Sequence, residues 1–379
     1  MERKYSIMIQ FDHTLFIVLC GTTLVGITSG IIGCFVVLQR QSLFGDAIAH
    51  ATLPGLTGMF LYTSSKAPLP LFVGATISGI LGAWAIQLIN QHSTLKKETS
   101  LGIILSTTFG LGTVFLSIIQ AYPTASKAGI NKFLLGNSAT LLYDDLKVII
   151  IVTAIVIATI TACWKECKLF VFNQEFAHSI GINTRLIHII LTALTVLTII
   201  VGLQTVGVVL ISSLLIAPAS AAYQWTHRLA PMVFLSCLFS SIATITGTLI
   251  SCSHAHLPTG PIIIVVATLC TFFSILCAPQ NGILYAHYKK KQQLKTIHAE
   301  KMLSHFMLFN ESKTNPFHPH DLQALQAIGK KSTNETLQYL AAQKLIISPQ
   351  KNFWCLTAKG VAYTQNLQKK YHARKQYPC

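Results

Sequence analysis

Asp46 and His50 are the residues whose types and spacing best fit a chemical role. They lie four positions apart in the segment Gly45–Gly55, which reads GDAIAHATLPG. Residues four apart share one face of a helix, so this carboxylate and this imidazole can hold one divalent cation between them. An ionisable residue within a membrane span is costly and usually functional. The alternative is that Asp46 caps a helix and His50 packs against a neighbouring one.

The composition of the rest of the chain indicates that this pair lies within a membrane. Of its 379 residues, 52% are hydrophobic and 11% are charged, which excludes a protein that is soluble throughout. A helix of about 20 apolar residues crosses a bilayer and satisfies its own backbone there. Eight runs meet this description, and a ninth, near 46–62, is more polar: the eight are 14–38, 69–90, 101–120, 145–163, 186–202, 205–222, 230–250 and 260–279. We therefore predict an all-α polytopic membrane protein with eight or nine transmembrane helices.

Lysine and arginine in short loops predict the orientation, since such loops stay in the cytoplasm. Lys96-Lys97, the segment 165–185, Arg228 and the lysines at 289–291 are assigned to that side. The side of the N terminus stays open, because Arg3 and Lys4 favour the inside whereas nine spans place it outside.

The segment Gly45–Gly55 resembles the Gly-Asp-x-x-x-His-x-x-x-Pro-Gly signature of the membrane subunits of ABC-type manganese, zinc and iron importers, the ABC-3 permease family. Three later blocks resemble the same family in the same order, so that the resemblance covers about residues 14–279: 132–137 with 144–146, 204–207 with 214–219, and 257–261.

The resemblance implies a permease of the bacterial inner membrane that moves divalent metal inward past Asp46 and His50. It holds no permanently bound cofactor, since the manganese, zinc or iron is cargo. Its implied partners are an extracytoplasmic metal-binding protein, an ABC ATPase subunit, and a second permease copy or a paralogous permease.

The chain also lacks a phosphate loop of its own. Gly329-Lys330-Lys331-Ser332 imitates the end of GxxxxGK[ST], but Ala324 stands where the first glycine is required. There is no HExxH and no second Gly-Asp pair for an intramembrane protease. We therefore expect a transporter subunit, not an enzyme, that borrows a separate ATPase.

Two shorter segments are further candidates. Residues 172–181 resemble the family's ATPase-coupling segment, with Glu175, Ala177 and Gly181 at matching positions; the alternative is a loop helix ended by a C-cap glycine. His254 and His256 stand before the Leu-Pro-x-Gly turn, where many relatives carry an acidic residue. They are possible outer contacts for incoming metal, or else solvated loop residues.

The last hundred residues have a different composition. Residues 280–379 hold fifteen Lys/Arg against four Asp/Glu, a net charge of +11 within the total of +16. We predict a permease domain at 1–279, a basic linker at 280–297 and a small C-terminal winged helix-turn-helix domain at 298–379, in the cytoplasm. Its expected elements are helices over 299–309, 319–328 and from 332, strands at 345–347 and 353–356, and a last helix over 360–370.

The stretch 342–360, ending Leu356-Thr357-Ala358-Lys359-Gly360, resembles the wing of diphtheria-toxin-repressor-type metal-dependent regulators. If the domain binds DNA, Thr333, Asn334 and Gln338 face base edges. The cations that neutralise phosphates are then Lys330, Lys331, Lys351 and Lys359. The alternative is a protein-interaction or metal-sensing domain that regulates transport without binding DNA, with His298, His305, His318 and His320 as possible ligands.

Overall fold

The computed structural model describes residues 13–63, 68–121, 141, 143–253, 257–279, 282–311, 318–323, 325, 333–350 and 352–376. The chain divides into two compact units, residues 1–283 and 284–379. Each unit has its own hydrophobic core.

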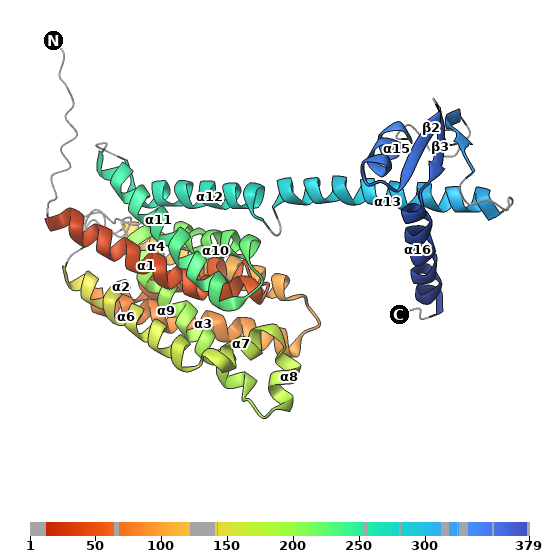
Figure 1. Cartoon of the computed structure of the whole chain (residues 1–379). Coiled ribbons are helices and arrows are strands. Elements are labelled where there is room, and N and C mark those ends of the chain that lie inside the picture. The colour runs from red at the N-terminus through yellow and green to blue at the C-terminus, as the bar shows by residue number, and fades with distance from the viewer. Residues whose placement is uncertain are drawn as a thin grey trace, which may run out of the picture. The chain divides into compact units, whose positions relative to one another are not determined.

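The first unit is helical throughout its described residues (Figure 1). Its helices are α1 (His13–Leu38), α2 (Phe44–Thr63), α3 (Pro68–His92), α4 (Lys97–Ala121), α6 (Tyr143–Ala162), α7 (Trp164–Phe172), α8 (Gln174–Ser179), α9 (Thr184–Val206), α10 (Val208–Trp225), α11 (Leu229–Ser253) and α12 (Thr259–Cys277).

All nine apolar runs of the sequence coincide with helices. Among the described residues, seven helices are long and apolar enough to cross a membrane: α1, α3, α4, α6, α9, α11 and α12. The other two, α2 and α10, fall outside this set, and many of their side chains are buried against other helices. The structure therefore confirms a polytopic helical protein and supports seven of the eight or nine predicted crossings.

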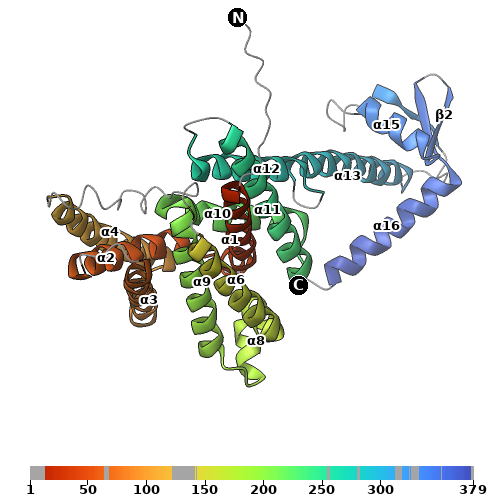
Figure 2. The ribbon, with the colours of Figure 1, turned by 90° about the vertical axis from the view of Figure 1, so that its left-hand side faces the viewer.

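Two groups of helices make up this unit. Helices α2, α3 and α4 contact one another and form one group, beside a second group that includes α1 and α9 to α12 (Figure 2). Helix α1 contacts α6, α9, α10 and α11, and α2 joins the two groups through α9 and α10.

Small residues let the backbones of α1 and α11 approach closely. The Ser236 hydroxyl donates a hydrogen bond to the Gly30 carbonyl (2.9 Å), and the Ser240 hydroxyl donates to the Gly26 carbonyl (2.7 Å). In lipid the hydrophobic effect does not drive helices together, so close packing and hydrogen bonds between helices stabilise their association instead.

The second unit combines helices with a small sheet. Its elements are α13 (Ile283–Glu311), β1 (His320–Asp321), α15 (Thr333–Ala342), β2 (Ile346–Gln350), β3 (Phe353–Leu356) and α16 (Ala358–Gln376). The antiparallel sheet has the order β1-β3-β2. Its core includes Met302, Leu303, Phe306, Leu325, Leu337, Leu340 and Leu356.

Two elements of this unit differ from their prediction. Helix α13 begins at Ile283 and therefore runs through most of the expected linker, because no proline or glycine interrupts residues 283–311. The helix expected over 319–328 is wrong at its start, where His320 and Asp321 pair with Trp354 and Phe353 as a third strand. The expected hairpin is present as β2 and β3.

Candidate functional site

Helix α2 places Asp46 and His50 on its least buried stripe. Asp46 lies in the first turn of α2, and His50 lies one turn later on the same face. Both side chains are partly exposed, whereas Ala47, Ile48 and Ala49 between them are buried. The His50 ring meets Phe109 of α4 edge-on, with centroids 5.0 Å apart. Its Nδ1 atom is buried and has no hydrogen-bond partner in the described part of the chain.

The buried faces of α2 explain why this stripe is held in place. A Cβ at Gly45 would lie 3.2 Å from Leu215 of α10, and a Cβ at Gly55 would lie 2.1 Å from the Gly74 carbonyl of α3. The Ser78 hydroxyl of α3 also donates a hydrogen bond to the Ala51 carbonyl (2.5 Å). Because neighbours fix its other faces, α2 has little freedom to rotate Asp46 and His50 inward.

The pair offers one carboxylate and one imidazole, a ligand set that suits manganese, zinc or ferrous iron. Among the described residues, no group of three or more His, Cys, Asp or Glu side chains could hold a metal ion. On the described stripe of α2, Asp46 and His50 thus stand as two candidate ligands.

The second predicted site falls on the short helix α8. Asn173 caps this helix, since its side-chain oxygen accepts a hydrogen bond from the Phe176 N–H (2.9 Å). Glu175 is exposed, but Ala177 is buried and Gly181 has a φ of 89°. Of the three predicted residues, Glu175 has an exposed side chain, whereas Ala177 packs into the interior and Gly181 shapes the turn after α8.

Sequence reasoning missed the apolar character of this loop. Phe172, Phe176 and Ile180 are each more than half exposed around α8. These large apolar side chains lie outside the candidate membrane spans, so they are candidates for contact with another protein. The signal was present in the sequence as three bulky residues at intervals of four.

The remaining predicted residues divide into three sets: exposed, buried, and outside the described residues. Asn334 and Gln338 are exposed one turn apart on α15, and Lys359 is exposed at the start of α16. Thr333 is only 4% exposed, so the prediction that it faces a base edge is wrong: its side chain belongs to the interior of the unit. His254, His256, Lys330, Lys331 and Lys351 lie outside the described residues.

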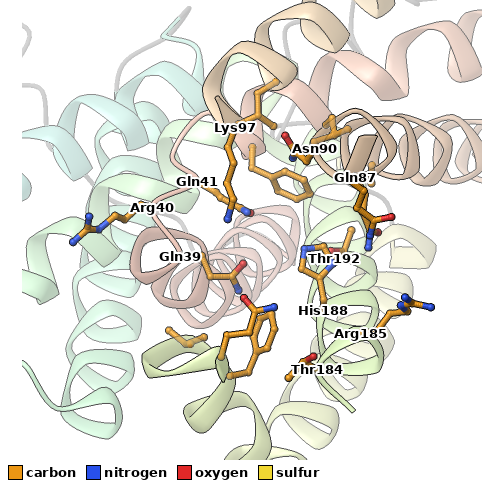
Figure 3. Close-up of a pocket in the computed structure, with 18 of the residues that line it drawn as sticks. Gln39, Arg40, Gln41, Gln87, Asn90, Lys97, Thr184, Arg185, His188 and Thr192 are labelled. Atoms are coloured by element: carbon orange, nitrogen blue, oxygen red, sulfur yellow. The ribbon is translucent and has the colours of Figure 1, made fainter. Parts of the chain in front are cut away.

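A polar cavity of about 460 Å³ was also not predicted. Its lining comes from the α1–α2 connection, the facing ends of α3 and α4, and the segment from α7 to the first turns of α9 (Figure 3). It includes Gln41, Lys97 and His188. These residues are far apart in the sequence and form no local motif, so only the fold brings them together.

The long apolar helices define a polytopic helical membrane protein, in which α2 carries a pair of polar residues. The model of the ABC 3 transport family matches residues 11–278, and the chain belongs to this family.

Named relatives agree with this assignment. The chain is 40% identical to the zinc transport system membrane protein TroC of Treponema pallidum over 281 residues, 74% of this chain and 94% of that protein. It is 34% identical to the manganese transport system membrane protein MntC of Bacillus subtilis over 373 residues, 98% of this chain and 84% of that protein. These names describe transporter components, which confirms a transporter subunit rather than an enzyme.

A solved structure supports the same fold. PsaBC from Streptococcus pneumoniae, in complex with a Fab, superposes with a TM-score of 0.65 and 30% identity, covering 74% of this chain and 96% of the other. Both this match and that to TroC leave about a quarter of the present chain uncovered.

Proposed function

We propose that this chain is the membrane subunit of an ATP-driven importer of divalent transition metal in the bacterial inner membrane. It receives manganese, zinc or iron from an extracytoplasmic binding protein and passes it to the cytoplasm. The observation that carries this proposal is the Asp46–His50 pair, which lies on a partly exposed stripe of α2 with Ala47, Ile48 and Ala49 buried between the two residues. The names of the relatives favour manganese and zinc over iron.

A second permease copy, or a paralogous permease, completes the site. The stripe of α2 is left partly open by its own chain, and each copy brings one carboxylate and one imidazole. Two copies facing each other supply two Asp–His pairs, enough to replace much of the hydration shell of a metal ion. Because the shell is shared between subunits, a movement of one against the other opens it and releases the cargo.

The ATPase subunit docks at α8. Glu175 gives a charged contact, and Phe172, Phe176 and Ile180 give an apolar one. Aromatic residues set in a small exposed patch are typical anchors of a protein interface. Helix α8 leads into α9, which contacts both α1 and α2, so movement of the docked ATPase reaches the helix that carries Asp46.

Metal uptake by cells tests the main proposal. Asp46→Asn and His50→Gln should each lower uptake of radioactive manganese or zinc at least about ten-fold, the effect of losing ~1.4 kcal/mol of binding. Glu98→Gln and His92→Gln, which change exposed residues at the ends of α4 and α3, are the matched controls and should transport normally. Full uptake by both site variants, at equal amounts in the membrane, would refute the role of the pair.

His254 and His256 are proposed as outer contacts for incoming metal. A His254→Ala/His256→Ala double variant should lose uptake at low external metal and regain it at high metal. Unchanged uptake at low metal would assign both residues to the solvated loop.

For the second unit we propose a winged helix with a regulatory role. What favours DNA is the pair Asn334 and Gln338, exposed on α15 next to a strand hairpin, in a unit that carries Lys359 on its surface. Asn and Gln can each pair with adenine in the major groove. The alternative is a domain that binds protein or senses metal and regulates transport directly.

Fluorescence anisotropy of the purified unit 284–379 separates these alternatives. On DNA from upstream of its own gene cluster, we expect selective binding that weakens with salt. Asn334→Ala/Gln338→Ala should relax the selectivity, while Asn366→Ala on the exposed side of α16 should not. Weak binding that is equal on all DNA sequences would instead favour a domain that binds protein or senses metal.

A further inference from the structure

The cavity of about 460 Å³ joins three connections of the first unit. Gln39 and Gln41 come from the α1–α2 connection, Gln87 and Asn90 from α3, and Lys97 from the start of α4. Across from them lie residues of α7 and α9, including Phe170 and His188. Neither Asp46 nor His50 lines the cavity, so it is distinct from the candidate metal site.

The charged residues of the lining all carry one sign. Arg40, Lys97 and Arg185 line the cavity, together with no aspartate or glutamate. Within the described ranges the one ion pair joins Lys147 to Asp144, so none of these three cations has a carboxylate at ion-pair distance there. A divalent cation would be repelled by this surface, whereas an anion would be attracted.

Uncharged hydrogen-bonding groups complete the lining. The Nδ1 atom of His188 is buried and has no hydrogen-bond partner in the described part of the chain. Asn90 accepts a hydrogen bond from the Ser100 hydroxyl through its Oδ1 atom (2.7 Å), which leaves its two amide N–H donors for other partners. A buried polar atom without a partner is costly, so a ligand that satisfies His188 gains binding energy.

The side chains converge from opposite walls. Figure 3 shows Lys97 extending from the start of α4 toward Gln41, and His188 facing the same space from α9. Phe170 closes one side, with its ring edge-on to His188 at a centroid distance of 6.1 Å.

We propose that this cavity binds a phosphate group, held by Lys97 and His188 with the amide groups of Gln39, Gln41 and Asn90 around it. A phosphate offers several strong acceptor oxygens to these donors, and charge-assisted hydrogen bonds of this kind are the strong ones. The group belongs either to an anionic lipid headgroup or to free phosphate. It ties the start of α4 to α9, next to the loop that carries α8.

Thermal unfolding of the full-length chain, purified in a phosphate-free detergent buffer of constant ionic strength, tests this site. Two probes are titrated separately: inorganic phosphate and a short-chain phosphatidylglycerol. We expect at least one of them to raise the Tm by several degrees. A response to both identifies free phosphate as sufficient, and a response to the lipid alone identifies the headgroup.

Matched variants decide whether the cavity is responsible. Lys97→Gln and His188→Gln should each weaken the response at least about ten-fold, while Lys96→Gln, the neighbouring exposed lysine that does not line the cavity, should respond as the natural chain does. Lys97→Arg keeps the charge and should retain most of the response. The proposal is overturned if neither probe shifts the Tm, or if Lys97→Gln responds as strongly as Lys96→Gln. Because the readout is binding, it is independent of metal transport.

Discussion

Gly181 shows how a single backbone conformation fixes the loop after α8. Its φ of 89° is in the region that L side chains rarely adopt, yet a Cβ there would meet nothing within 4 Å. Gly181→Ala should therefore destabilise the chain by about 1–2 kcal/mol through backbone strain alone. The Tm in detergent measures the loss. Gly102→Ala, also with open space around its Cβ but inside helix α4, should not lower the Tm.

Cys167 on α7 gives a prediction with a pH dependence. Its side chain is fully buried, and burial is the main cause that raises the pKa of its thiol to about 11. Since the thiolate is the reactive form, a single-cysteine variant that keeps Cys167 should react very slowly with maleimide at pH 7 and faster as pH approaches 11. Fast labelling at pH 7 in the folded chain, as rapid as in detergent-unfolded chain, would contradict this burial.

At this scale the sequence was informative where residue type alone carries the signal. Asp46 and His50 stand out because charged groups are rare in apolar helices, and their i, i+4 spacing predicts a shared face. Thr333 was misassigned because a position in a helix indicates an exposed face only when it is known which side of the helix is buried. His188 gave no signal, since Lys97, which lines the same cavity, is about ninety positions away and only packing brings the two together.

Helices α1 and α10 are packed so closely that adding one methyl group between them should force them apart. A Cβ at Gly33 would lie 1.9 Å from the Leu215 carbonyl oxygen, which is backbone and cannot move aside. Gly33→Ala should thus cost about 1–3 kcal/mol or more and lower the Tm. Gly110→Ala, where a Cβ meets nothing within 4 Å, provides the comparison and should fold normally. Equal Tm values for the two variants would show that α1 and α10 are not in contact.

Helix α8 should fail as a docking element when its apolar surface is charged. Phe176 is 51% exposed, so Phe176→Asp should leave the fold intact and weaken ATPase binding at least about ten-fold, ~1.4 kcal/mol. Pull-down of the ATPase with the solubilised chain measures this. Tyr143→Asp changes another exposed aromatic residue at the far end of α6 from α7 and α8, and should bind normally. Normal binding by Phe176→Asp would move the ATPase contact away from α8.

The helices of the first unit were predictable because a lipid-facing helix can be recognised from its length and its apolar composition. The same rule does not tell whether α2 crosses the membrane, since its polar residues lower its mean hydropathy. In the second unit, strand β1 was missed because two residues, His320 and Asp321, carry no alternation of apolar and polar positions. Its existence depends on pairing with β3, a contact of more than thirty positions in sequence.

The two compact units of the whole molecule should be separable. The alignment with TroC covers 94% of that protein but 74% of this chain, so that relative has no counterpart to about a quarter of this chain. A chain ending at Ile283 should therefore insert, show the Tm of the membrane unit and import metal. Metal uptake by cells grown in high metal, measured for the truncated and the full chain, then shows whether the second unit regulates transport. Loss of folding on truncation would mean that the membrane unit depends on residues 284–379.

Helix α2 has a consequence for how the protein is made. Asp46, His50 and Pro54 keep it out of the set of helices apolar enough to cross on their own, although α3, α4, α9 and α10 surround it in the finished chain. A translocon that releases segments into lipid by their individual hydrophobicity has little reason to release this one alone. We expect α2 to stay beside the translocon until α3 and α4 emerge, so that insertion of this polar helix depends on helices that are made after it.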